Sequence, residues 1–250
     1  MSPPPLPSGL SLAAPAYNEG ESIARVVSGW LQYLRSQNLD SFEIVITNDG
    51  SRDRTGAILD ELAREAPELR VIHLERNLGA AAALARAIQA TRKDLVMLID
   101  SDGQFPVENF EALQKALAAD SADAAHGVRG RKIDSLFSRF GSWSSGRLSN
   151  WILGTHYRDF NCTCKLMKGG LARSLRLEAK GLNYSPDVMA NLITRRVKIV
   201  EVSIQHRPRA GGKSSVRALR DALHRFLFVS YLGVRQFLMH AEILERPQWP

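Results

Sequence analysis

The stretch DLVMLIDSDGQFP, from Asp94 to Pro106, decides the fold expected for this chain. Its apolar part, Leu95 to Ile99, is bounded by polar residues, which is typical of a strand covered on both faces in a parallel sheet. Asp100, Asp102 and Gln104 follow at alternate positions. In open α/β sheets ligands bind at the carboxyl ends of strands, so we expect these three side chains to face a crevice.

The Asp-x-Asp pattern in this stretch predicts a metal site. Carboxylate and amide oxygens are hard ligands that suit Mg²⁺ or Mn²⁺, and these ions keep positions for water and substrate phosphate. The alternative is that Asp100 or Asp102 caps a helix that begins near Pro106. A bare Asp-x-Asp is common, so the choice between the two depends on the rest of the chain.

Before this stretch the chain alternates short apolar strands with helical patterns. We expect strands at residues 10–14, 43–47, 70–74 and 94–99, helices near 23–34, 55–66 and 77–91, and a later strand at 124–128. This alternation implies right-handed crossovers and a doubly wound, mostly parallel sheet flanked by helices, which is an α/β fold. No G-x-G-x-x-G follows the first strand and no P-loop pattern occurs, which excludes two common nucleotide sites.

Polar side chains gather at two further strand ends. Tyr17, Asn18 and Glu19 follow the first strand, and Asp49 and Asp53 follow the second. A carboxylate such as Asp49 can accept N–H bonds from a uracil or guanine edge, and Glu19 can accept from a ribose hydroxyl. The alternatives are a turn residue at Asp49 and a helix N-cap at Asp53. Three polar strand ends side by side favour a nucleotide site.

Four segments in this order and spacing resemble the inverting GT-A glycosyltransferases of family 2: PAYNE (15–19), DGSRD (49–53), RNLGAAAALARAI (76–88) and DSDGQFP (100–106). Within that family the chain is most similar to the polyprenyl-phosphate sugar synthases, the group of dolichol-phosphate mannose synthase and bacterial undecaprenyl-phosphate glycosyltransferases. The resemblance runs from Leu10 to about Arg217 and implies a GT-A fold.

The resemblance also implies roles for named residues. It assigns nucleotide binding to side chains at the three strand ends, namely Pro15, Tyr17, Glu19, Asp49 and Asp100. It assigns a Mg²⁺ or Mn²⁺ ion, with the donor diphosphate, to Asp100, Asp102 and Gln104. The reaction that it implies moves a sugar from a nucleotide-diphosphate donor to a dolichyl or undecaprenyl phosphate.

Basic residues of the second half match phosphate ligands of the same group. Arg129 and Arg131 occupy the place of a phosphate-contacting arginine, and Arg139 and Ser142 match polar positions of the next motif, DSLFSRFGS. HRPRAGGKSS (206–215) resembles the loop that closes on the donor and acceptor phosphates. The resemblance therefore assigns a part in catalysis to Asp102, Arg129, Arg139, Arg209 and Lys213. His206 is given no catalytic role, because a histidine at a strand end can simply bind a carbonyl.

The segment DFNCTCKL (159–166) departs from the pattern of the group, with Asn161 in place of glycine and Lys165 in place of arginine. The role of Lys165 is therefore left open. Cys162 and Cys164 stand two apart, where a strand would put both on one face and make a mutual disulfide unfavourable. We interpret both cysteines as small buried hydrophobic residues.

The charge of the chain, with 33 Lys and Arg against 26 Asp and Glu and a net +7, favours anionic partners. A nucleic-acid-binding domain ranks last, because an acidic cluster without metal repels phosphate. A sugar-phosphate nucleotidyltransferase would carry a glycine- and arginine-rich loop after its first strand, and PAYNE is not that loop. A soluble family 2 transferase that glycosylates a sugar or protein hydroxyl is the main alternative.

The need for a catalytic base separates the two transferase hypotheses. A lipid phosphate has a second pKa of about 6, so it is largely dianionic at neutral pH and needs no side-chain base. A hydroxyl acceptor requires a positioned Asp or Glu. Between residues 107 and 159, Asp134 is the one carboxylate that we retain as a candidate.

The chain divides into a Pro-rich arm at residues 1–9, expected to be mobile, a glycosyltransferase domain at 10–213 and a C-terminal amphipathic helix with a tail at 214–250. The first residues, MSPPPLPSG, lack the basic start and apolar core of a signal peptide. No apolar run reaches the roughly 18 residues of a spanning helix. These features predict a cytoplasmic protein that at most lies on a membrane.

Two segments of the sequence favour a peripheral contact of the protein with the membrane surface. Residues 135–153 and 216–244 carry aromatic, aliphatic and basic residues at roughly helical spacing, among them Trp151, Phe226 and Arg235. Such amphipathic helices can lie in the membrane interface with arginines at the headgroups. The alternative is packing on the sheet or on a second subunit. The expected partners are therefore the donor, the lipid acceptor, the membrane surface and a membrane protein, and not nucleic acid.

Overall fold

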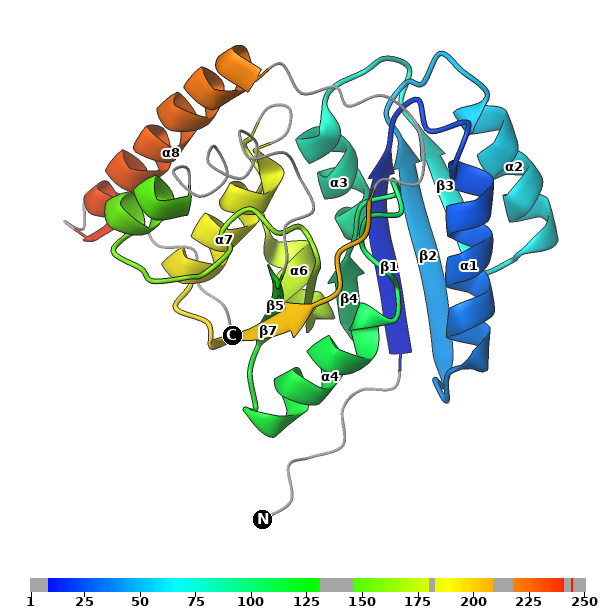
Figure 1. Cartoon of the computed structure of the whole chain (residues 1–250), viewed down its shortest axis with the longest axis horizontal. Helices are drawn as coiled ribbons and strands as arrows, with labels where there is room; N and C mark the ends of the chain where they lie inside the picture. Colours follow the sequence, from blue (N-terminus) through cyan, green and yellow to red (C-terminus); the bar gives the residue numbers. More distant parts are fainter. Residues whose placement is uncertain (1–8, 131–145, 180–182, 209–217, 241–243, 245–250) are drawn as a thin grey trace.

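The structure, a computed structural model, describes residues 9–130, 146–179, 183–208, 218–240 and 244. Its first half alternates strands and helices (Figure 1). The elements are β1 (Gly9–Ala16), α1 (Ile23–Ser36), β2 (Ser41–Asn48), α2 (Thr55–Glu65), β3 (Leu69–His73), α3 (Ala80–Gln89) and β4 (Leu95–Leu98). Every strand and helix expected up to β4 is present, with boundaries that differ by at most three residues.

The second half completes the sheet with α4 (Asn109–Ala119), β5 (Ala124–Arg129), β6 (Lys165–Lys168), α6 (Gly169–Ser174), α7 (Tyr184–Thr194), β7 (Ile199–Ile204) and α8 (Ala218–His240). Residues 146–153 are also helical. Across the described ranges the strands form one seven-stranded sheet in the order β3-β2-β1-β4-β6-β5-β7. β6 runs antiparallel to β4 and β5, and the other pairs are parallel. The predicted mostly parallel α/β sheet is confirmed, with β6 as an unforeseen antiparallel strand.

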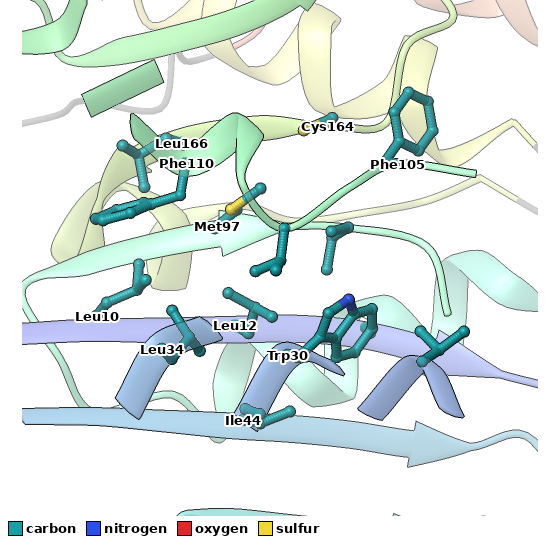
Figure 2. Packing of buried hydrophobic residues seen from close by; sticks show 14 of the residues in the cluster. Leu10, Leu12, Trp30, Leu34, Ile44, Met97, Phe105, Phe110, Cys164 and Leu166 are labelled. Carbon is teal, nitrogen blue, oxygen red and sulfur yellow. The ribbon is translucent and has the colours of Figure 1, made fainter. Parts of the chain in front are cut away.

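Side chains that alternate along the central strands build a hydrophobic cluster on each face of the sheet. Leu10 and Leu12 of β1 belong to the cluster that includes α1 and α4, whereas Ala13 belongs to the cluster that includes α3, α6 and α7. Figure 2 shows Trp30 and Leu34 of α1 beside β1, and burying each such side chain contributes about 1.5–3 kcal/mol. β4 is buried throughout, as expected of a strand covered on both faces.

The parallel strands bring their carboxyl ends to one edge of the sheet. β1, β2, β4 and β5 all end at this edge, and the antiparallel β6 begins there. In the β4–β6 register Lys165 pairs with Leu98, two residues before Asp100. The loops at this edge therefore carry the candidate site residues that follow β1, β2 and β4.

α8 lies next to α7, on the side of the molecule away from α1 and α2 (Figure 1). It buries Val229 and Leu232 but exposes the side chains of Phe226, Leu227, Tyr231, Val234 and Phe237. The helix at 146–153 approaches α8 closely at Gly233, where a Cβ would lie 2.1 Å from Ile152 Cγ2. Among the described residues, no helix combines the length and apolarity needed to cross a membrane.

Candidate active site

Backbone and side-chain hydrogen bonds join the loops that follow β1 and β2. Asn18 donates its backbone N–H to Ser51 Oγ at 3.0 Å, and Arg52 donates its backbone N–H to Asn18 Oδ1 at 2.9 Å. Asn18 reaches this position with a φ of 53°. The two loops are therefore held side by side, as the strand-end pattern predicted, with Tyr17 partly exposed and Glu19 buried.

Asp53 connects the same two loops at the start of α2. Its Oδ1 accepts the backbone N–H of Thr55 at 3.0 Å at the start of α2, and its Oδ2 accepts the N–H of Gly20 at 2.9 Å. Burial alone would raise the pKa of this carboxyl, but the hydrogen bonds from Thr55 and Gly20 outweigh burial and lower the pKa. Asp53 directly precedes Arg54, the N-cap residue of α2, and its contacts with Thr55 and Gly20 hold the loop to the start of this helix.

Asp49 holds the loop before α3. Its two oxygens accept the backbone N–H groups of Leu78 at 2.7 Å and of Gly79 at 2.9 Å, and the residue is 1% exposed. Burial raises the pKa of Asp49 although these N–H donors act against the rise. Gly50, with a φ of 63°, allows Arg76 to approach so closely that a Cβ would lie 2.5 Å from its carbonyl carbon. The nucleobase role of Asp49 stays a prediction.

The Asp100–Gln104 turn lies directly against the end of β1. Ser101 donates its hydroxyl to the carbonyl of Pro15 at 2.7 Å. Asp102, which is 8% exposed, accepts the backbone N–H of Gln104 on Oδ1 at 3.0 Å across Gly103, whose φ is 75°. α4 begins at Asn109, and its N-cap residue is Glu108, which makes no side-chain cap hydrogen bond.

The donor set of this turn fits a cation that is shared with a substrate. Mg²⁺ is commonly held by one or two carboxylates together with substrate phosphates and water, and Asp100 and Asp102 supply such a pair. Over the part of the chain that the structure describes, no group of three or more His, Cys, Asp and Glu residues is arranged to hold a metal ion. Asp100 and Asp102 would therefore supply part of the shell, with phosphate oxygens and water in other positions.

Arg129, predicted to contact phosphate, lies at the end of β5 in a buried ion pair. Its Nε donates to Asp159 Oδ2 at 2.7 Å and its Nη2 donates to Asp159 Oδ1 at 2.9 Å. The two side chains are only 12% and 2% exposed. A surface hollow of about 630 Å³ opens beside Asp159, and Arg147, Trp151 and Arg158 also line it. The phosphate role of Arg129 stays a prediction.

Several predicted site residues lie outside the described residues, so the structure gives them no position. They are Arg131, Asp134, Arg139, Ser142, Arg209 and Lys213. His206 is described, and its ring lies 5.1 Å from that of Phe105.

The segment that begins at Asp159 contains the buried side chains of Cys162, Cys164 and Lys165. Lys165 is 1% exposed and donates to Ser185 Oγ at 2.9 Å and to the carbonyl of Cys162. Burial lowers the pKa of Lys165 to about 8. Cys162 and Cys164 are free and fully buried, and burial raises the pKa of Cys162 to about 12. The interpretation of the cysteines as buried hydrophobic residues is confirmed.

Two residues of α7 were missed by the sequence analysis. Tyr184 donates its hydroxyl to Asp100 Oδ1 at 2.6 Å. Asp187 accepts the backbone N–H groups of Glu178 at 2.6 Å and of Ala179 at 2.8 Å on one oxygen, and burial raises its pKa. Nothing in the local pattern NYSPD pointed to either contact, because the partners lie far away in the sequence or in an irregular segment.

The profile of the family described as Glycosyl transferase family 2 matches residues 11–172. The chain therefore belongs to glycosyltransferase family 2, as the four segments predicted. The match spans the three strand-end loops, β5 and β6, so it contains the Asp100–Gln104 turn and the Arg129–Asp159 pair.

Two relatives are similar to this chain over most of its length. Dodecaprenyl-phosphate galacturonate synthase of Rhizobium johnstonii is 26% identical over 234 residues, which cover 89% of this chain and 68% of the relative. Undecaprenyl-phosphate 4-deoxy-4-formamido-L-arabinose transferase of Pseudomonas paraeruginosa is 30% identical over 216 residues, which cover 84% of this chain and 61% of the relative. The chain thus spans about two thirds of the length of these relatives.

A solved structure supports the fold. Glucosyl-3-phosphoglycerate synthase of Mycobacterium tuberculosis, in complex with Mn²⁺ and UDP-glucose, superimposes with a TM-score of 0.65 at 20% identity. The alignment covers 90% of this chain and 78% of that chain. The likeness confirms the predicted GT-A type of fold.

Proposed function

We propose that this protein is an inverting glycosyltransferase that moves a sugar from a nucleoside-diphosphate donor to a polyprenyl phosphate. The observation that carries the proposal is the turn after β4, where Ser101, between Asp100 and Asp102, binds the carbonyl of Pro15 at the end of β1. The names of the dodecaprenyl-phosphate and undecaprenyl-phosphate relatives support the acceptor. The neighbour in complex with Mn²⁺ and UDP-glucose supports the donor and the cation.

The donor is proposed to bind across the loops after β1, β2 and β4. The donor nucleotide would contact Pro15, Tyr17, Glu19, Asp49 and Asp100, with the nucleoside at the first four of these residues. Asp100, Asp102 and Gln104 would hold Mg²⁺ or Mn²⁺, which when bound supplies positive charge to the departing diphosphate. Arg129 and the predicted ligands Arg139, Arg209 and Lys213 would add fixed positive charge for the donor and acceptor phosphates.

The acceptor is proposed to attack without a side-chain base. A phosphate monoester is largely dianionic at neutral pH, so one of its oxygens is already a nucleophile. Two buried carboxylates near the carboxyl edge and α7 are engaged in the protein itself: Asp159 with Arg129, and Asp187 with the backbone at residues 178 and 179. These contacts engage two carboxylates that could otherwise serve as the base of a hydroxyl acceptor, and Asp134, the retained candidate, lies outside the described residues.

The exposed apolar side of α8 supports peripheral membrane binding as part of the same proposal. Phe237 is 68% exposed on this helix, and Trp151 is 81% exposed on the helix that packs against α8 through Ile152 and Gly233. Apolar side chains that face outward on adjacent helices can bury themselves among lipid headgroups and acyl chains. The net charge of +7 suits anionic lipids, and a membrane-protein partner would reinforce this contact.

We predict that a Trp151→Ser, Phe237→Ser double variant binds anionic liposomes at least about tenfold more weakly than the wild type, since each change removes a large apolar side chain from the lipid contact. Co-sedimentation at low and high salt measures the effect, and salt should weaken binding of the wild type. Equal binding of variant and wild type would show that α8 does not face the lipid.

Transfer assays test the proposed function. A thermal-shift screen of UDP-, GDP-, dTDP- and CMP-sugars with Mn²⁺ first identifies the donor, because a ligand at 100 times its Kd adds about 2.7 kcal/mol of stability. The selected donor is then offered with a polyprenyl phosphate or with water-soluble sugar acceptors. Transfer to the polyprenyl phosphate is the expected result. Transfer to soluble acceptors only, together with no liposome binding at low salt, would favour the soluble transferase.

A further inference from the structure

Tyr184, at the first position of α7, reaches across to the proposed cation site. Its hydroxyl lies 2.6 Å from Asp100 Oδ1, and the residue is 7% exposed. The hydroxyl is the donor in this bond, and the carboxylate oxygen is the acceptor. A short hydrogen bond to an ionised carboxylate is among the stronger ones in proteins and restrains the direction of the carboxylate.

The start of α7 is itself fixed to the strand beside β4. Ser185 donates its hydroxyl to the carbonyl of Cys162 at 2.7 Å and accepts a hydrogen bond from Lys165 Nζ at 2.9 Å. Lys165 belongs to β6 and pairs in register with Leu98, which precedes Asp100 by two residues. Because Lys165 and Ser185 are buried, water does not compete for these bonds.

These contacts form a continuous path from β6 to the carboxylate. Lys165 and Cys162 hold Ser185, and the adjacent Tyr184 holds Asp100. Both ends of the path are anchored at neighbouring strands, since β4 leads into Asp100 and β6 carries Lys165. The tyrosine hydroxyl therefore has a fixed position relative to the Asp100–Gln104 turn.

We propose that Tyr184 is a positioning residue for the cation site, with Ser185 and Lys165 as its anchor. Its hydroxyl holds one oxygen of Asp100 and so sets the orientation in which this carboxylate meets a divalent cation. The inference rests on the proposed function, because it assumes that Asp100 serves a cation shared with the donor diphosphate. In metal sites generally, losing a hydrogen bond to a ligand costs about 10- to 100-fold in metal affinity or activity.

Tyr184→Phe is the variant that tests this role, because it keeps the ring and removes only the hydroxyl. Mn²⁺ is titrated into the protein saturated with UDP, and the free ion is measured by electron paramagnetic resonance. We expect an affinity for Mn²⁺ that is about tenfold weaker than that of the wild type. Transfer activity should fall most at limiting Mn²⁺ and recover in part at high Mn²⁺, which loss of packing alone would not produce.

Tyr33→Phe provides a matched control. Tyr33 of α1 also donates its hydroxyl to a carboxylate, that of Glu111 in α4, at 3.0 Å, but this bond is on the surface and away from the strand-end loops. This variant should bind Mn²⁺ as the wild type does. Ser185→Ala keeps the tyrosine and removes its anchor, and we expect it to weaken Mn²⁺ binding less than Tyr184→Phe.

The outcomes separate this inference from the function on which it rests. Wild-type affinity for Mn²⁺ in Tyr184→Phe would overturn the positioning role and leave the proposed function standing. If Tyr184→Phe fails to fold, Ser185→Ala decides, and wild-type affinity in that variant would overturn the anchored path. A wild-type protein that binds its donor and transfers sugar without any divalent cation would overturn the metal assignment and the role of Tyr184 together.

Discussion

Asp102→Asn is expected to lower the rate of sugar transfer by about 10²- to 10³-fold, the loss typical of removing one preorganised group that stabilises transition-state charge. Asparagine has nearly the same shape, and its amide oxygen can still accept the backbone N–H of Gln104 that Asp102 Oδ1 accepts at 3.0 Å. The turn should therefore persist while the negative charge for the cation is lost. The measurement is the transfer rate at saturating donor and Mn²⁺.

Asp60→Asn is the control for this change, because Asp60 is an exposed carboxylate of α2 whose partner is the exposed His73. It should leave transfer unchanged. Chelation of divalent ions should stop transfer by the wild type, and added Mg²⁺ or Mn²⁺ should restore it. Full activity of Asp102→Asn, or of the wild type in a chelator, would contradict the metal assignment.

The strand-end positions of these residues were predictable because they depend on local pattern. Five consecutive apolar residues before Asp100 are compatible with a strand buried on both faces, and the repeated strand-helix alternation requires parallel pairing. Parallel strands end at one edge, so side chains that follow β1, β2 and β4 had to come together. The hydrogen bonds of Asn18 with Ser51 and Arg52, and of Ser101 with Pro15, are the consequence.

Long-range partners were not predictable in the same way. β6 contains only Lys165, Leu166, Met167 and Lys168, and a fully buried lysine contradicts the usual exposure of this residue type. Tyr184 reaches Asp100 from 84 residues further along the chain, and the pattern around it is that of an ordinary helix start. Such contacts depend on how α7 packs on the sheet. The spacing of residues within one segment of the sequence does not determine this packing.

Arg129 shows how a position can be predicted while its partner is missed. The sequence places this arginine at the end of a strand on the site edge, and the structure agrees. The resemblance to the family suggested phosphate as its ligand, but Asp159, thirty residues later, accepts two hydrogen bonds from its guanidinium. Asp159 is therefore a partner of this arginine within the fold, and the phosphate role of Arg129 stays a prediction.

The Arg129–Asp159 pair leads to the largest stability effect that we expect. Asp159→Ala should lower the free energy of unfolding by about 3–5 kcal/mol, because removing one partner leaves a buried charge without compensation. Asp159 also accepts the backbone N–H of Arg129 at 3.2 Å, so a second donor loses its acceptor. Burial lowers the pKa of Lys165, and Asp159 is among the negative groups that raise it, so the variant weakens the charged state of this lysine as well.

Glu68→Ala is the matched control for that experiment. Glu68 accepts two hydrogen bonds from Arg35, at 3.0 and 2.9 Å, in the same two-pronged geometry, but the side chain of Arg35 is 50% exposed. Exposed ion pairs contribute little, because water and salt screen them and both side chains lose freedom. Urea unfolding of both variants, followed at low and high salt, should therefore show a small effect for Glu68→Ala.

The double variant Arg129→Ala, Asp159→Ala separates burial of a charge from loss of packing. Removing both partners leaves no unpaired ion, so the double variant should be more stable than Asp159→Ala alone. If Asp159→Ala proves no more destabilising than Glu68→Ala, the buried pair is not a determinant of stability.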